Sequence, residues 1–367
     1  MPLPCERGAV TLLQLRRFAI ARSLFAPTTL KRAIDRLGFV QADPIRAPAR
    51  AQDLTLRHRV KGYRAGDLER RYPALGIEED FFVNYGFLPR PVHALMHPRR
   101  ARLAWSPARR RQAEAVHAYV REHGVVHPRR VDAHFAPGRV IGGFGGASSA
   151  TTRLLDDMHY RGMLRVARRE AGIRLYEMRE AHEPAVDATI ALDRLIDVIV
   201  AKYAPLPGAS LVQLVRYLAG GTPQWRGRLK QGVERARTRL CSAASEGVDW
   251  YWPAGEVVPQ CEPEERVRLL APFDPVVWDR RRFGIFWGWT YRFEAYTPAA
   301  KRRLGYYALP LLWCDEIVGW GNLSVVDEEL HANFGYVSGK APRGPAFRRA
   351  LDEELQNMRA FLGLDLT

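Results

Sequence analysis

The chain has 367 residues, a hydrophobic content of 47% and a net charge of +16, values that predict a globular protein of two or three domains. It contains no apolar run long enough for a transmembrane helix and no hydrophobic leader, so we expect a cytoplasmic protein with no membrane attachment. The four cysteines are far apart and form no Cys-x-x-Cys. This argues against a zinc site and a disulfide framework, and it fits a reducing cytoplasm.

The positive charge is concentrated in one part of the chain. Residues 1–150 carry 26 Lys and Arg against 12 Asp and Glu, whereas residues 151–367 carry 30 against 28. Most of the surplus is arginine, whose planar guanidinium suits bidentate phosphate contacts. A generally basic surface is the alternative explanation. The localised surplus favours a polyanion partner, and nucleic acid above all.

The first 110 residues are predicted to form helices around one short strand. Apolar spacing predicts the helices and alternation predicts the strand. The expected elements are a helix at 11–24, a helix at 30–37 between a Thr28 cap and Gly38, a strand at 40–43 and a helix at 46–59. Pro44 is expected to end the strand.

An apolar cluster and an arginine run complete this part. Within residues 81–88 an apolar cluster is expected in the core, formed by Phe81, Phe82, Tyr85, Phe87 and Leu88. Residues 97–111 hold six arginines and no acidic residue. Such a run is usually a solvated face, but it could also follow a phosphate backbone.

Residues 111–185 have the clearest local pattern. We expect helices at 111–122, at 129–135 and, capped by Ser148 or Ser149, up to Tyr160, followed by a hairpin of strands 164–170 and 173–178. Three helices and a hairpin predict a winged helix-turn-helix, whose third helix would enter a DNA groove.

The pattern is repeated in residues 186–260. The expected elements are helices at 191–203, at 211–218 with Ser210 as cap, and at 224–242, then a hairpin around Glu246–Gly247. Tandem units of this kind would form a curved basic surface around a duplex.

The last part, residues 261–367, is predicted to be rich in strands. Aromatic, strand-like runs occupy 283–296, 305–313 and 317–325, with a turn at Asp315–Glu316, and a helix at 343–362 closes the chain. The expected fold class is α+β, with tandem winged helix-turn-helix units and a C-terminal β-sheet or barrel element. The expected domains are 1–110, 111–185, 186–260 and 261–367.

Two kinds of site are not supported by the sequence. The glycine-rich turn Gly142–Gly146 lacks the Lys-[ST] of a P-loop, and none of the ten histidines has metal-ligand spacing. We therefore expect no cofactor and no metal.

Gln41 and Asp43 form a polar pair on the predicted strand. Residues two apart face the same side of a strand, so an amide and a carboxylate would lie side by side and could hold and polarise one water molecule. The pattern alone is weak, and the alternative is that both side chains merely cap the next helix.

Several segments, in order along nearly the whole chain, resemble the AlkZ/YcaQ-like winged-helix DNA glycosylases. The segments are Leu37–Asp43, Arg50–Ala51, Asp53–Leu56, Val131–Phe135, Ser148–Thr152, Met158–Gly162, Leu270–Pro275, Tyr291–Pro298 and Leu304–Pro310. The catalytic motif of that family is Gln-apolar-Gln or Gln-apolar-Asp. Gln41-Ala42-Asp43 is similar to the second form, that of the crosslink-unhooking branch, although Ala42 is smaller than the usual aliphatic residue.

The resemblance implies a monofunctional DNA glycosylase that hydrolyses the N-glycosidic bond of alkylated purines of the N7-alkylguanine type and unhooks interstrand crosslinks. Asp43 would accept the proton of the attacking water and Gln41 would hold that water. Arg50 would orient Asp43 or hold a phosphate, with a purely structural salt bridge as an open alternative.

The expected partner is double-stranded DNA with alkylation damage or crosslinks, bound by a monomer that is nucleoid-associated when on DNA. A non-enzymatic winged-helix DNA-binding protein or transcriptional regulator is the alternative, and it should dimerise on a palindromic site. The residues expected to contact DNA are Arg46, Arg50, Arg57, Arg109, Arg110, Ser148, Ser149, Thr151, Arg153, Arg168, Arg169, Arg226, Arg228 and Lys230.

Overall fold

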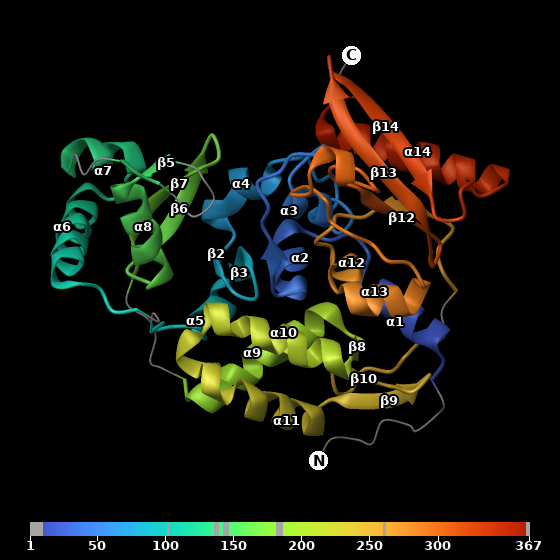
Figure 1. The fold of residues 1–367 in the computed structure, drawn as a ribbon, viewed down its shortest axis with the longest axis horizontal. Coiled ribbons are helices and arrows are strands. Elements are labelled where there is room, and N and C mark those ends of the chain that lie inside the picture. Colours follow the sequence, from blue (N-terminus) through green and yellow to red (C-terminus); the bar gives the residue numbers. More distant parts are fainter. Residues whose placement is uncertain are drawn as a thin grey trace. The chain divides into compact units, whose positions relative to one another are not determined.

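The computed structural model describes residues 10–100, 103–135, 139–141, 147–180, 186–259 and 262–364 (Figure 1). The chain forms two compact units. Unit 1 comprises Met1–Leu68, Ile196–Leu214 and Val233–Thr367, and unit 2 comprises Glu69–Leu195 and Val215–Gly232. Both helices and strands are abundant, as expected from the sequence. The division into four domains stays a prediction.

The N-terminal elements of unit 1 are α1 Leu12–Ser23, α2 Leu30–Leu37, β1 Val40–Gln41 and α3 Ala51–Leu56. The expected apolar stripe of α2 is buried in full, at Leu30, Ala33, Ile34 and Leu37. The expected cap was wrong by one residue, because the side chain of Thr29 accepts the hydrogen bond from the Arg32 N–H, while Thr28 forms a β-bridge with Val60.

The strand and the third helix are both shorter than predicted. β1 has only two residues, and the helix expected over 46–59 is limited to α3. Pro44 and Pro48 explain this, since each removes a backbone N–H and disfavours helical geometry in the residue before it. The intervening residues form an irregular loop directly after Asp43.

Unit 2 contains a hairpin that the sequence did not predict. The elements of this segment are α4 Asp67–Arg71, the 3₁₀ turn Tyr72–Ala74, β2 Ile77–Phe81, β3 Tyr85–Pro89 and α5 Arg90–Ala94. β2 and β3 are antiparallel, with Phe81 opposite Tyr85. Phe82, Phe87 and Leu88 are buried, so the apolar cluster is largely core as expected.

Three helices and a hairpin follow in the predicted order. They are α6 Pro107–His123, α7 Pro128–Phe135, α8 Ala150–Tyr160, β6 Leu164–Glu170 and β7 Ile173–Met178, with a small pair of strands, β4 Arg139–Ile141 and β5 Ala147–Ser149, before α8. The hairpin turns at Ala171–Gly172, both of which have positive φ as a tight turn requires. The glycine-rich turn at 142–146 lies outside the described residues.

The second helical segment differs from its prediction in detail. Its elements are α9 Ala188–Tyr203, β8 Leu206–Pro207, α10 Gly208–Gly221, the 3₁₀ turn Pro223–Arg228, α11 Leu229–Arg239, β9 Cys241–Ser245 and β10 Val248–Trp252. Ser210 is inside α10 rather than at its start, because the helix begins directly after Pro207. The predicted helix at 224–242 is a 3₁₀ turn followed by α11. The wide cysteine spacing argued against disulfides, and this was wrong for Cys241, which is disulfide-bonded.

The C-terminal part of unit 1 is an open sheet with one helix against it (Figure 1). Its elements are β11 Val267–Leu269, α12 Pro275–Trp278, α13 Arg280–Trp287, the 3₁₀ turn Ala299–Lys301, β12 Leu309–Trp313, β13 Glu316–Val326, β14 Glu329–Tyr336 and α14 Pro345–Leu362. The strand order is β11-β12-β13-β14, a sheet rather than a barrel. α14 packs against β11.

The strand predicted at 283–296 was wrong. The segment begins as the helix α13, because the Asp279 carboxylate accepts hydrogen bonds from the N–H groups of Arg281 and Arg282, and Gly288 ends the helix in the left-handed conformation. The turn between β12 and β13 is one residue earlier than expected, at Cys314–Asp315. None of the helices in the described part of the chain has both the length and the hydropathy of a membrane-spanning segment.

Candidate active site

The backbone that leads into the Gln41-Ala42-Asp43 motif is held by close packing from both sides. Gly38 has a φ of +65°, and a Cβ at this position would lie 2.7 Å from Val198 Cγ1 of α9, so only glycine fits. The buried ammonium of Lys202 donates a hydrogen bond to the carbonyl oxygen of Phe39. Burial lowers the pKa of Lys202 to about 7. These contacts fix the direction of β1.

The two polar side chains of the motif are buried and differently bonded. Gln41 is 5% exposed and Asp43 is 8% exposed. Gln41 Oε1 accepts a hydrogen bond from Trp278 Nε1 at 2.7 Å, whereas Asp43 Oδ1 accepts one from the Ile45 backbone N–H at 2.9 Å. The Asp43 N–H donates to Gln52 Oε1 at 3.2 Å. Neither side chain is an N-cap of α3, because Arg50 occupies that position.

Burial makes the Asp43 carboxyl a weaker acid than a solvent-exposed aspartate. Desolvation raises the pKa of the Asp43 carboxyl above its ordinary value, and the hydrogen bond from Ile45 opposes this only in part. The carboxylate also lies close enough to Tyr307 and Tyr296 for its charge to help raise their pKa values, after the larger effect of burial. None of the described residues forms a hydrogen bond with the buried hydroxyl of Tyr307.

A pocket of about 760 Å³ is lined by the loop that follows Asp43 and by Tyr307, on which the charge of this carboxylate acts. One wall is the loop that follows Asp43, from Arg46 to Pro48, and the other is formed by residues 305–307, 322–325 and 331–333 of the C-terminal sheet and the loop before it. The described residues therefore combine a buried carboxylate, an amide and a large open pocket within unit 1.

A buried ion pair holds the start of α12, the helix that carries Trp278. Arg59 and Asp274 have fully buried side chains, and Arg59 Nη1 and Nη2 donate to the two oxygens of Asp274 at 2.8 and 3.0 Å. Asp274 in turn accepts from the Val276 N–H and starts α12, the helix that ends at Trp278. In the sequence, Asp274 was noted only as part of a segment that resembles the family. Arg59 and Asp274 are 215 positions apart, so their ion pair leaves no local pattern in the sequence.

The residues expected to contact DNA divide by their exposure. Six are exposed: Arg46, Arg110, Arg168, Arg226, Arg228 and Lys230. Arg50, Arg109 and Arg153 are half-buried, and the side chains of Ser148 and Ser149 lie outside the described ones. Thr151 is buried, which argues against a contact with DNA.

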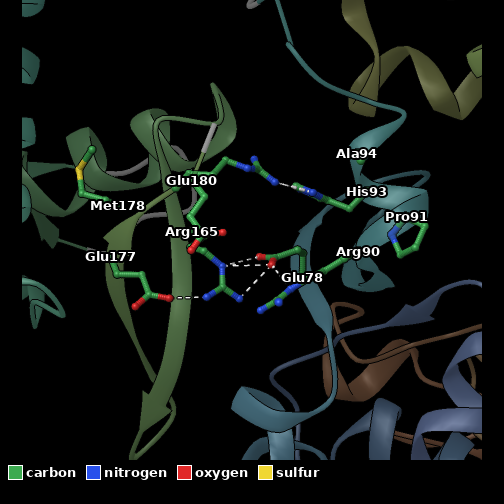
Figure 2. A pocket seen from close by; sticks show the side chains of 10 residues that line it. Glu78, Arg90, Pro91, His93, Ala94, Arg165, Glu177, Met178 and Glu180 are labelled. Carbon is green, nitrogen blue, oxygen red and sulfur yellow. Dashed lines mark hydrogen bonds and ion pairs between the residues drawn. The ribbon is translucent and has the colours of Figure 1, made fainter. Parts of the chain in front are cut away.

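Three of the expected DNA contacts have acidic partners. The Arg57 side chain is 4% exposed and pairs with Glu354, Arg169 pairs with Glu79 of β2, and the exposed Arg168 pairs with Glu170. Arg165 of β6 donates hydrogen bonds to both Glu78 and Glu177 (Figure 2). Guanidinium groups that are engaged in this way are poor candidates for phosphate contacts.

Unit 2 also contains a histidine cluster that the sequence did not reveal. Asp80, His93 and His97 bring one ligand atom each to within 4.8 Å of one another. However, Arg99 donates to Asp80 Oδ1 at 2.9 Å, and Arg179 donates to the His93 ring. A cation here would face two guanidinium groups, so we read the cluster as a buried ion-pair network. Arg99, part of the arginine run, is thereby buried in the core and not on a phosphate-binding face.

The comparisons with known proteins agree with this arrangement. The sequence matches the model of the family "DNA glycosylase AlkZ-like" over residues 34–361. The solved structure of the Streptomyces sahachiroi DNA glycosylase AlkZ is similar, with a TM-score of 0.64 and 16% sequence identity over 97% of this chain and 98% of that chain. At this identity the structural likeness shows the fold alone, whereas the family match spans most of the sequence. The chain therefore belongs to the AlkZ-like DNA glycosylase family, and it is a DNA glycosylase of DNA repair.

Proposed function

We propose that this protein hydrolyses the N-glycosidic bond of N7-alkylguanine and related alkylated purines in duplex DNA, and that it also unhooks interstrand crosslinks of this chemistry. The observation that carries the proposal is the buried Asp43 carboxylate, whose charge acts on Tyr307 and whose following loop, with Tyr307, lines the pocket of about 760 Å³. This combination offers a base of raised pKa and a space large enough for a damaged nucleotide.

Alkylation at N7 makes the purine cationic, so it leaves without a strong general acid. In the proposed reaction a water molecule attacks C1′ as the C1′–N9 bond breaks, and the bonding electrons return to the purine and neutralise it. Asp43 accepts the proton that the water releases, and its negative charge stabilises the oxocarbenium-like sugar. Positioned proton transfer of this kind contributes roughly 10²–10⁴-fold.

We further propose that α6–α8 with β6–β7, and α9–α11 with β9–β10, are winged-helix units that bind duplex DNA as a monomer. Three helices followed by a hairpin are the elements of that motif, and exposed cations lie on both segments. The glycosylase is expected to be monofunctional, because water, rather than a lysine, is the proposed nucleophile.

The test is an excision assay on a duplex with a single N7-methylguanine and on a duplex crosslinked by nitrogen mustard. After incubation, hot alkali cleaves abasic sites and a denaturing gel separates the products. The proposal expects strand cleavage at the lesion and loss of the crosslinked band. Intact substrate in both assays, with an active control glycosylase in parallel, would refute it.

The excision rate should depend on pH through Asp43. The carboxyl must be ionised to accept a proton, so the rate is expected to fall as pH decreases through its pKa. Since burial raises that pKa, the fall should begin above the ordinary aspartate value of about 3.9. Single-turnover rates between pH 4 and 9 on a duplex that is stable over this range measure the profile. A rate that stays flat down to the ordinary aspartate value would contradict the prediction.

Loss of Arg226 and Arg228 should weaken DNA binding without changing chemistry. Both side chains are exposed and basic. If each contacts one phosphate, the double alanine variant should reduce the slope of log K against log salt by roughly 2. Arg348 and Arg349 on α14 are likewise exposed and provide the matched control pair. Fluorescence anisotropy at several salt concentrations measures the slopes, and equal slopes for both variants and wild type would exclude the proposed contacts.

A further inference from the structure

The hydrogen bond between Trp278 and Gln41 determines which end of the Gln41 amide is engaged by the protein and which end is left for a ligand. An indole N–H can only donate a hydrogen bond, so the atom 2.7 Å from Trp278 Nε1 must be the carbonyl oxygen of Gln41. The amide nitrogen, Nε2, is then directed elsewhere. The orientation follows from the chemistry of tryptophan rather than from a choice between two similar atoms.

The Nε2 group of Gln41 remains available for a ligand. No described residue accepts a hydrogen bond from it. The Gln41 side chain as a whole is buried, but the Nε2 atom itself is not closed off from solvent. The NH₂ group therefore retains access to solvent next to the Asp43 loop.

Trp278 is itself held in place by the core. It lies at the end of α12, which starts at the Asp274 carboxylate and is fixed by the Arg59 pair. Its ring packs on Tyr203, with ring centres 5.3 Å apart. An indole with a rigid helix behind it and an aromatic ring beside it is a fixed donor rather than a mobile one.

We infer that Trp278 is a positioning residue, which holds Gln41 Oε1 so that Nε2 points toward the substrate as a hydrogen-bond donor. The inference rests on the proposed function and deepens it. Gln41 then cannot accept the proton of the water through its engaged oxygen, and this role falls to Asp43 alone. Gln41 instead donates to the lone pair of the attacking water or to an oxygen of the damaged nucleotide, and this leaves the O–H bond of the water directed at Asp43.

The first test is kinetic and uses a double-mutant cycle. Trp278→Phe keeps the ring and removes the N–H, so it should lower the single-turnover excision rate roughly 3- to 10-fold with little change in DNA affinity. In a Gln41→Ala background the same substitution should have no further effect, because its target is gone. An unchanged rate for Trp278→Phe, or an equal loss in both backgrounds, would overturn the inference.

A matched control comes from Trp287, whose Nε1 donates to the Asp315 carbonyl oxygen at 2.9 Å in the same unit. Trp287→Phe also removes one indole hydrogen bond, and it should leave the excision rate within twofold of wild type. A loss equal to that of Trp278→Phe would mean that both act through general stability, and the inference would fail.

The second test does not depend on catalysis. In ¹⁵N-tryptophan-labelled protein, the indole N–H signal that disappears in Trp278→Phe should exchange slowly with solvent. It should shift and exchange faster in Gln41→Ala, and it should recover protection in Gln41→Glu, which retains an acceptor at the same position. An indole signal indifferent to Gln41 would refute the hydrogen bond. A coupled signal in a protein without excision activity would instead refute the proposed function and leave the positioning contact intact.

Discussion

Asp43→Asn is expected to abolish excision of N7-alkylguanine while the protein still binds duplex DNA. Asparagine has nearly the same shape, and its carbonyl oxygen can still accept the hydrogen bond from the Ile45 N–H that Asp43 Oδ1 accepts in the structure. It cannot accept a proton or stabilise a positive sugar by charge. The single-turnover rate should therefore fall by roughly 10²–10⁴-fold, measured by alkaline cleavage of a singly modified duplex.

The raised pKa of Asp43 also predicts how Asp43→Asn changes stability, and this shows whether the variant is folded. A carboxyl whose pKa is raised in the folded state favours folding when protonated, and this stabilisation is lost as pH rises through the folded pKa. At neutral pH the ionised Asp43 thus costs stability, and asparagine removes that cost. The variant should unfold in urea at the same or a higher midpoint than wild type. Undiminished product from a folded Asp43→Asn protein would remove Asp43 from the mechanism.

The largest effect on stability is expected from breaking the Arg59–Asp274 pair. Both side chains are fully buried, and Arg59 also donates to the carbonyl oxygens of Ser23 and Thr55. Arg59→Met keeps a long apolar chain but leaves the Asp274 charge buried without its partner. Loss of one member of a buried pair costs about 3–5 kcal/mol, which should appear in the free energy of unfolding from urea titrations.

Two further variants separate the ion pair from simple loss of a side chain. Arg59→Met/Asp274→Asn removes the unpaired charge and should recover part of the stability, since the amide oxygen can still accept from the Val276 N–H as the carboxylate does. Arg348→Met, at an exposed position of α14, should change the unfolding free energy by about 0.5 kcal/mol or less. A small loss in Arg59→Met, comparable with that of Arg348→Met, would contradict the assigned role of the pair.

Much of the local structure could be predicted from the sequence because its causes are local. The apolar periodicity of α2, α6 and α8, and the turn residues of the β6–β7 hairpin, act over a few positions and indicated these elements correctly. Errors arose where another local signal competed. Pro48 shortened the start of the helix expected over 46–59, and the Asp279 cap made a helix of residues whose aromatic content favoured a strand.

The candidate site could also be predicted only in part from the sequence. The Gln41-Ala42-Asp43 motif and the family segments were visible in the chain itself, as was the excess of arginine. Which arginines are available to DNA was not, because Arg57, Arg99 and Arg169 pair with acidic groups that are distant in sequence. A count of charges cannot distinguish a buried pair from an exposed cation.

The sequence by itself thus determined the motif, the basic character and the family resemblance, all of which are properties of residue type and order. Only the tertiary structure decided that Asp43 is desolvated, that the loop after it lines a large pocket, that Arg59 and Asp274 stabilise α12, and that Trp278 sets the orientation of Gln41. The physical reason is that burial and hydrogen-bond geometry depend on what the fold brings close. Trp278 and Gln41 are 237 positions apart, and no periodicity along the chain records their contact.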